Sequence, residues 1–102
     1  MHIVSKKKIV EYCKSNRRKD ARAAKETLDA WYYEVKRAQW SAPSEIKAKY
    51  RSASILPKER VVFNICGNKY RLVVIVRFRA RRVYIRFIGT HAEYDKINAT
   101  EV

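Results

Sequence analysis

The sequence predicts an α+β fold in which helices come first along the chain and strands follow. Between about residues 20 and 39, apolar residues recur every three or four positions, which is the spacing of one buried helix face. From residue 61 onward they recur every second position, which is the spacing of a β-strand. We therefore expect N-terminal helices packed on one face of a small antiparallel sheet, followed by a short C-terminal helix.

Three helices are expected before the sheet. Ser5 can cap a short first helix, because its hydroxyl can accept a hydrogen bond from a free N–H of the first turn. A longer helix should cover residues 20–39, with Trp31 anchoring its buried face rather than stacking on a base. A short third helix is expected over residues 44–50, after the break at Pro43.

Three strands follow, joined by two turns. Gly67 and Asn68 form a two-residue link with glycine first, which suits a type II′ turn and pairs Asn64 with Arg71. The second link has no strong turn signal. A tight turn centred on residues 80–81 would join the second and third strands. It would pair Ile75 with Arg86 and Arg77 with Tyr84. The expected strands span residues 61–66, 70–78 and 82–88.

The alternation divides the strands into two faces. One set of positions is wholly apolar, so it must face the helices and form the core. The other set carries arginines and must face away. This basic face is marked in the sequence, since the stretch from Arg60 to Ala92 contains eight Lys or Arg residues and no Asp or Glu.

The charge of the chain limits the classes of partner that it can bind. The net charge is +14 over 102 residues, which favours a polyanion, with nucleic acid ahead of an acidic protein and an anionic membrane third. A merely soluble basic protein is the remaining alternative. No apolar run approaches the ~20 residues of a membrane span. We expect a single domain over residues 1–102, in the cytoplasm, without membrane contact.

The two cysteines suggest neither a metal site nor a disulfide framework. Cys13 and Cys66 are 53 positions apart in the sequence and have no Cys-x-x-Cys spacing. Both are expected to pack as small hydrophobic side chains in a reducing compartment. We expect no metal and no cofactor.

Titratable groups cluster where the basic stretch ends. Thr90 and Glu93 have the spacing of a capping box, which predicts a short helix. On that helix His91, Tyr94 and Asp95 are three and four positions apart and should share a face. Free N–H groups at the helix start could also hold an anion.

These residue types suit metal-free cleavage of RNA. Arg71 and Arg86 can hold phosphate through paired hydrogen bonds and a permanent charge. His91 can exchange protons near neutral pH, and Tyr94 can donate a proton or stack on a base. Each could instead be a solvated or structural residue. The wider RNA-binding set is Asn64, Lys69, Arg77, Arg79, Arg81, Arg82, Tyr84 and Asp95.

Several segments together resemble the HigB toxin family. They are residues 30–35, 50–56, 61–74 and 83–95, so the resemblance covers nearly the whole chain. It implies a RelE-like fold and the toxin of a type II toxin–antitoxin system. It also implies a ribosome-associated mRNA endonuclease, a HigA-like antitoxin with a helix-turn-helix domain, and a toxin–antitoxin complex that binds operator DNA.

The resemblance also implies roles for individual residues. Arg71 would bind the scissile phosphate, and His91 and Tyr94 would stand where the superfamily has a basic residue and an aromatic one. His91 departs from the arginine or lysine of many relatives, so it could act as acid, base or positioner. No carboxylate base is evident, which leaves Lys69 or His91 for that role. The alternatives are a non-catalytic RNA- or ribosome-binding module and a regulator that mainly binds an acidic partner.

Overall fold

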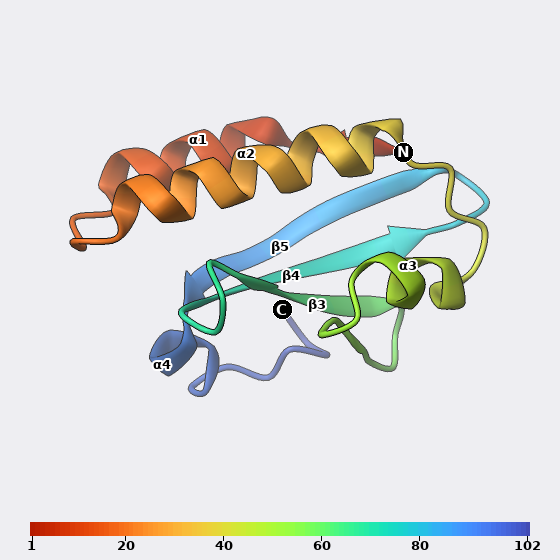
Figure 1. Ribbon diagram of the computed structural model, residues 1–102. Helices are drawn as coiled ribbons and strands as arrows, with labels where there is room; N and C mark the ends of the chain where they lie inside the picture. The colour runs from red at the N-terminus through yellow and green to blue at the C-terminus, as the bar shows by residue number, and fades with distance from the viewer.

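Five strands form one mixed sheet in the order β1-β5-β4-β3-β2. The computed structural model describes residues 1–102, and Figure 1 shows helices α1 and α2 lying across the sheet. All neighbouring strands are antiparallel except β1 and β5, which run parallel. The strands are β1 (His2–Val4), β2 (Ser54–Ile55), β3 (Arg60–Ile65), β4 (Tyr70–Arg77) and β5 (Arg82–Thr90). The helices are α1 (Lys6–Ser15), α2 (Ala21–Arg37), α3 (Pro43–Lys49) and α4 (His91–Tyr94).

The α+β prediction is confirmed, and the sheet is larger than expected. The three central strands and the four helices lie close to where the periodicity placed them. The edge strands β1 and β2 have only three and two residues, which is too short to show a period in the sequence. Ser5 does occupy the position before α1, but its side chain makes no capping hydrogen bond.

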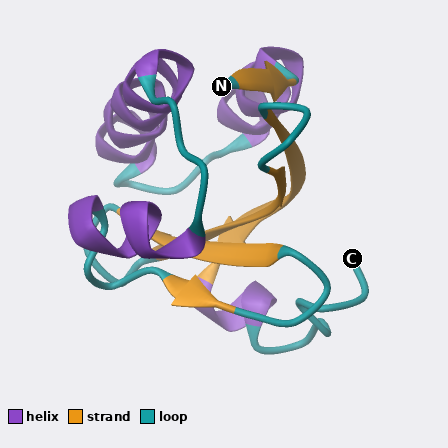
Figure 2. Cartoon of the chain, turned by 90° about the vertical axis from the view of Figure 1, so that its right-hand side faces the viewer, coloured by secondary structure: helices purple, strands orange, loops and turns teal.

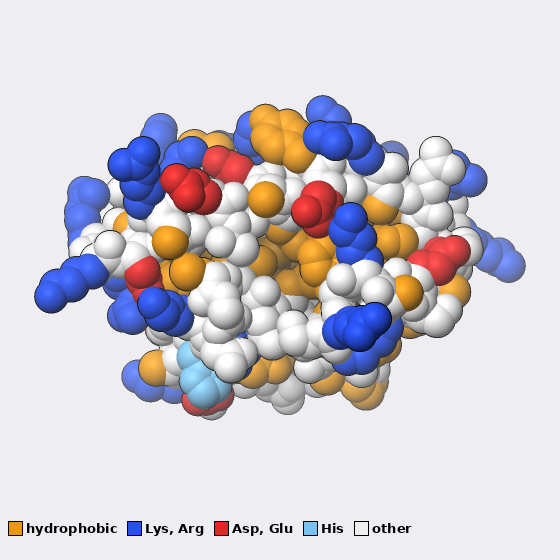
Figure 3. All heavy atoms as spheres, in the orientation of Figure 1, with side chains coloured by type: hydrophobic (Ala, Val, Ile, Leu, Met, Phe, Trp, Pro, Cys, Tyr) orange, Lys and Arg blue, Asp and Glu red, His pale blue; other side chains and the backbone are white.

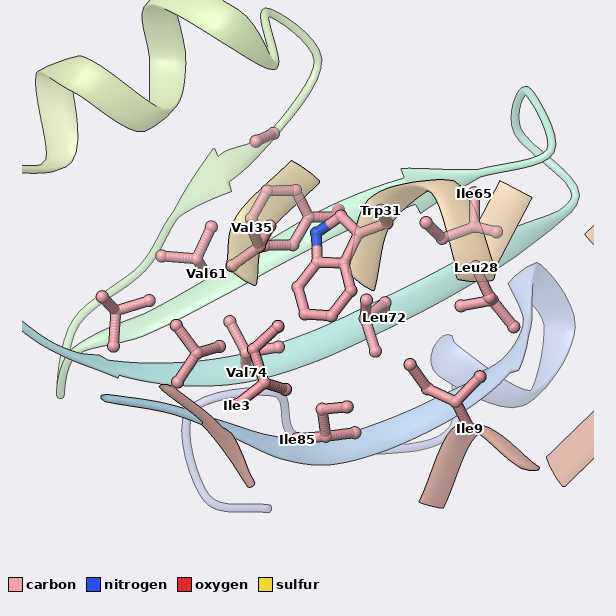
Figure 4. Close-up of a cluster of buried hydrophobic side chains, with 14 of the residues drawn as sticks. Ile3, Ile9, Leu28, Trp31, Val35, Val61, Ile65, Leu72, Val74 and Ile85 are labelled. Carbon is pink, nitrogen blue, oxygen red and sulfur yellow. The ribbon is translucent and has the colours of Figure 1, made fainter. Parts of the chain in front are cut away.

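The main core lies between the sheet and the helices. Figure 4 shows buried side chains of α1 and α2 meeting those of β3, β4 and β5. Trp31 is 3% exposed, and its ring packs edge-on against Phe63 with centroids 5.4 Å apart. Its predicted role as the anchor of α2 is therefore confirmed.

The face opposite the helices is also partly covered. Val62 and Val73 are buried there beneath Ala99 and form a second, smaller apolar cluster. Figure 2 shows α1 and α2 nearly end-on on one side of the sheet, with α4 on the other. Arg60 fastens the segment beyond α4, since its Nη2 donates to the Val102 carbonyl over 2.7 Å. The alternation alone suggests a basic face open to solvent, but the segment beyond α4 covers part of that face.

The first hairpin has the predicted register, whereas the second does not. Asn64 pairs with Arg71, as expected. In the second hairpin Ile75 pairs with Tyr84 rather than Arg86, and Arg77 pairs with Arg82 rather than Tyr84. The connecting turn is longer than predicted, because it uses residues 78–81.

A β-bulge in β5 explains the rest of the difference. Val73 pairs with Phe87 and Val74 pairs with Ile85, so Arg86 between them has no partner. One extra residue reverses the inward and outward alternation beyond it. Simple alternation from Val83 and Ile85 predicts that Phe87 faces the helices, but Phe87 packs on the second cluster and Ile88 packs on the main core.

The close approach of Phe87 to Gly89 predicts that adding a methyl group at position 89 lowers the stability of the fold. A Cβ at Gly89 would lie 2.5 Å from Phe87 Cζ, so the ring must move. We expect Gly89→Ala to lower the free energy of unfolding by about 1–3 kcal/mol, measured by urea denaturation. Adding Phe87→Leu removes the ring end and should recover part of that loss. If the effects of the two substitutions on the free energy of unfolding simply add, contact with the Phe87 ring is not the cause of the loss in Gly89→Ala.

Candidate functional site

Strand pairing brings Arg71 next to the start of α4. Tyr70 pairs with Thr90 and Arg71 with Gly89, so the beginning of β4 lies beside the end of β5. The last strand leads directly into α4, which carries His91. Residues that are about 20 positions apart in the chain therefore share one end of the sheet.

Arg71 is half-buried and its guanidinium is held in place. One nitrogen, Nη1, donates to the carbonyls of Asn68 and Tyr70 over 3.0 and 3.2 Å. The guanidinium carbon lies 5.9 Å from the centroid of the Tyr94 ring. The donors on Nε and Nη2 have no protein partner, so they are available to the oxygens of a phosphate.

The predicted capping box is present and orients α4. Thr90 Oγ1 accepts from the Glu93 N–H over 3.2 Å, and the Thr90 N–H donates to Glu93 Oε1 over 2.7 Å. The His91 N–H donates to the Lys69 carbonyl over 3.0 Å. Our expectation of an anion at this helix start is not supported, because three of its N–H groups already donate within the protein.

His91 and Asp95 form an exposed pair on α4. His91 Nε2 lies 3.6 Å from Asp95 Oδ1, and both side chains are more than half exposed. The carboxylate is therefore placed to orient the imidazole. Tyr94 is half-buried instead, because its ring packs against the second apolar cluster as well as Arg71.

Arg86 lies apart from this group. It is the unpaired residue of the bulge, it is exposed, and it lines a hollow of about 180 Å³ with Lys8 and Tyr12 of α1. Lys8 Nζ donates to the neighbouring Ile85 carbonyl over 2.9 Å. The bulge thus places Arg86 at the edge of β5 beside α1, and the structure does not bring it against Tyr94.

The other predicted residues divide between the two ends of the sheet. Asn64 pairs with Arg71, and its Nδ2 donates to the Ser52 carbonyl over 3.4 Å. Lys69 lies in the β3–β4 turn, exposed, and lines a hollow beside the α1–α2 loop. The remainder lie at or near the β4–β5 turn, at the opposite end in Figure 1. They are Arg77, which forms an ion pair with Glu59, the exposed Arg79, Arg81 and Arg82, and the half-buried Tyr84.

A basic group between α1 and α2 was not predicted from the sequence. Arg17, Arg18 and Lys19 are consecutive, exposed and adjacent in space to Lys69. In the sequence this run indicates only a polar end to the first helix. Three consecutive cations were the available signal, but the sequence does not show that the turn after β3 meets this loop.

Three other findings bear on the expectations from the sequence. No group of three or more His, Cys, Asp or Glu side chains is placed to hold a metal ion. Both cysteines are free. No helix has the combination of length and apolar character that a bilayer crossing requires.

Tyrosines beside the site have raised pKa values. Burial raises the pKa of Tyr12 to about 12, and the nearby Glu93 carboxylate adds to the rise. Burial also raises the pKa of Tyr70, and the hydrogen bond that its hydroxyl donates to Asp20 acts in the same direction. Both hydroxyls are therefore neutral, and neither serves as a base at physiological pH.

The α+β fold fits one class of protein, the RelE-like toxins, and comparison of the sequence shows the same class. A family model described as HigB_toxin, the RelE-like toxic component of a toxin–antitoxin system, matches residues 24–97. The chain belongs to the HigB toxin family. This confirms the resemblance seen in the sequence, and with it the RelE-like fold and an antitoxin as partner.

Individual relatives agree with this assignment. The mRNA interferase HigB of Escherichia coli O6:H1 is 29% identical over 99 residues, which cover 95% of this chain and 91% of the relative. The mRNA interferase toxin HigB of Escherichia coli K12 is 33% identical over 67 residues, which cover 64% of each chain. An mRNA interferase HigB of Shigella flexneri matches to the same extent as the K12 protein.

The raised pKa of Tyr12 predicts an alkaline loss of stability. Because the folded state favours the neutral hydroxyl, this contribution is complete below the ordinary pKa of 10.0 and is lost as the pH rises towards 12. We expect Tyr12→Phe to lose less stability than the wild type between about pH 9 and about pH 11.5, measured by urea denaturation. Tyr33→Phe is the control, because the Lys6 hydrogen bond lowers the pKa of Tyr33. Equal losses in wild type and Tyr12→Phe would contradict the assignment.

Proposed function

We propose that this chain inhibits translation by cutting mRNA at the ribosome, in the cytoplasm and without a metal ion. The main observation behind this proposal is the position of the Arg71 guanidinium. It is held beside the Tyr94 ring, it keeps free donors, and the His91–Asp95 pair lies on the adjacent helix. Membership of the HigB toxin family and the names of its mRNA interferase relatives support RNA as the substrate. The whole activity would reside in a single domain over residues 1–102.

The reaction needs three operations on the RNA. A ribose 2′-OH loses its proton and attacks the adjacent phosphorus, the extra negative charge on the phosphorus oxygens is held, and the departing 5′-oxygen takes up a proton. Arg71 is proposed to hold that charge, because its free Nε and Nη2 donors can bind two phosphate oxygens. Fixed donors of this kind are usually the largest single contribution to catalysis.

His91 is proposed to exchange the protons. Its side chain is exposed on the first turn of α4, where an RNA strand bound to Arg71 can reach it. Asp95 would orient the imidazole. Tyr94 either stacks on a base or donates to the leaving oxygen. Lys69 is the alternative base, although its side chain lies towards the α1–α2 loop.

The remaining predicted residues would bind RNA outside the reacting centre. Arg86 keeps its proposed catalytic role only if the RNA spans the edge of β5, so its replacement is part of the same assay. Asn64 and Tyr84 would contact the strand on the sheet. The arginines of the far turn, namely Arg77, Arg79, Arg81 and Arg82, would attract the RNA electrostatically.

The proposed partners follow from the same assignment. The antitoxin is proposed to be HigA-like with a helix-turn-helix domain, and the complex is proposed to bind operator DNA. A non-catalytic RNA- or ribosome-binding module is the second candidate function, since so many exposed cations lie outside the Arg71 group. Tight ribosome binding without cleavage would favour it.

Replacing Arg71 tests the proposed role in holding phosphate. Arg71→Ala should lower the rate of message cleavage on purified ribosomes by roughly 10²–10³-fold, with chelator present throughout. Arg71→Lys keeps the charge but loses the paired donors, so it should recover only part of the activity. Arg37→Ala is the matched control, because it removes an exposed arginine of α2 outside the predicted RNA-binding set, and it should remain close to wild type in rate at saturating ribosomes. Undiminished cleavage by Arg71→Ala would exclude this role.

Replacing His91 tests proton transfer. His91→Gln keeps a polar side chain of similar length but cannot exchange protons, so the cleavage rate should fall and its dependence on pH near neutrality should flatten. Asp95→Asn should reduce the rate less and keep a pH dependence. The measurement is the single-turnover rate on ribosomes across the neutral range. A pH profile unchanged by His91→Gln would transfer the role to another group.

A further inference from the structure

We infer that the α1–α2 loop and Lys69 form a second site for RNA backbone phosphates, next to the proposed cleavage site. A hollow of about 440 Å³ is lined by Arg17, Arg18, Lys19, Asp20 and Lys69, with no apolar residue among them. All four cations are exposed. Figure 3 shows Lys and Arg side chains gathered at the end of the molecule where α1 passes into α2. This inference rests on the proposed function for its ligand.

The one carboxylate in the hollow is committed to the protein. Asp20 accepts from the Tyr70 hydroxyl over 2.5 Å and lies 3.6 Å from Arg18 Nε. The hydrogen bond from Tyr70 is the main reason that the pKa of Asp20 is lowered. Four cations less one carboxylate leave the hollow with three net positive charges, which selects an anionic ligand with several charges.

The loop that carries these cations is held in a defined position. Tyr70 is fully buried, and its hydroxyl accepts from Asn16 Nδ2 over 3.0 Å while donating to Asp20. The Arg18 guanidinium lies 5.8 Å from the centroid of the Tyr70 ring. Both ends of the loop are therefore hydrogen-bonded to Tyr70, the residue before Arg71. Because the loop is already ordered, less conformational entropy is lost when a ligand binds.

The second site is continuous with the proposed cleavage site. Lys69 contributes its side chain to the hollow and its carbonyl to the His91 N–H. A neighbouring hollow of about 470 Å³ shares Arg17 and Arg18 and extends to Thr90, immediately before His91. Its one carboxylate, Glu93, accepts from the Thr90 N–H. An RNA strand bound at Arg71 can thus pass around the end of the sheet to the loop. Arginine forks without apolar lining match repeated phosphates rather than bases.

Two sources could supply these phosphates, the message itself or ribosomal RNA. The test compares wild type with Arg17→Gln/Arg18→Gln/Lys19→Gln by fluorescence anisotropy on a short 2′-O-methyl oligoribonucleotide, which cannot be cleaved. Lys7→Gln/Lys36→Gln/Lys49→Gln is the control, because it removes the same three charges from exposed positions on α1, α2 and α3. Thermal unfolding of both variants shows whether the fold is retained.

If the message occupies the site, the loop variant should bind the oligoribonucleotide about tenfold or more weakly than the control variant. Its slope of log affinity against log salt should fall by about two, since each phosphate contact to a single strand contributes roughly 0.7. Arg17→Lys/Arg18→Lys/Lys19→Arg keeps the charge and should retain most of the affinity. Tyr70→Phe keeps all four cations but frees the loop, so it should weaken binding with little change in slope.

The second arm uses ribosomes without message. A loss confined to ribosome binding would assign the site to ribosomal RNA. Equal affinities of the loop and control variants in both arms would overturn the inference, as would loss of antitoxin binding alone. Because neither arm requires cleavage, a wild type that binds RNA but fails to cut ribosomal messages would refute the proposed function without refuting this site.

Discussion

The pairing of Tyr70 with Thr90 is the contact on which the functional end of the molecule depends. It joins the first residue of β4 to the last residue of β5 and so fixes Arg71 relative to α4. On the helix side, the same tyrosine hydroxyl fastens the α1–α2 loop through Asn16 and Asp20. One buried residue therefore positions Arg71 and α4 through its backbone and the basic loop through its side chain.

Features that depend on local sequence could be predicted. The glycine turn after β3 set the pairing of Asn64 with Arg71, and the Thr90–Glu93 capping box set the start of α4, because each acts over only a few residues. The bulge at Arg86 could not be predicted, since nothing in the alternating pattern of β5 marks one residue as unpaired. The bulge changes the side of the sheet on which Phe87 lies and moves Arg86 away from the group first proposed.

The candidate site was predictable in its centre and not at its borders. Arg71, His91 and Tyr94 come from the segments that both the chemistry and the family resemblance identify. The floor beneath Tyr94, built around Ala99, and the loop beside Lys69 arise from contacts between distant parts of the chain. Such contacts leave no periodic signal in the sequence. These contacts bring Arg71, Lys69 and the cations of the α1–α2 loop to one end of the molecule. The arginines of the β4–β5 turn lie at the other end.

The two apolar clusters have a consequence for motion. They lie on opposite faces of β4, so Leu72, Val73 and Val74 are completely buried, and the strand has a hydrogen-bonded neighbour on each side. Backbone amides in such a strand exchange with solvent chiefly when the whole domain unfolds. Arg71 therefore extends from the strand expected to exchange most slowly, so its backbone would not need to be ordered when a ligand binds.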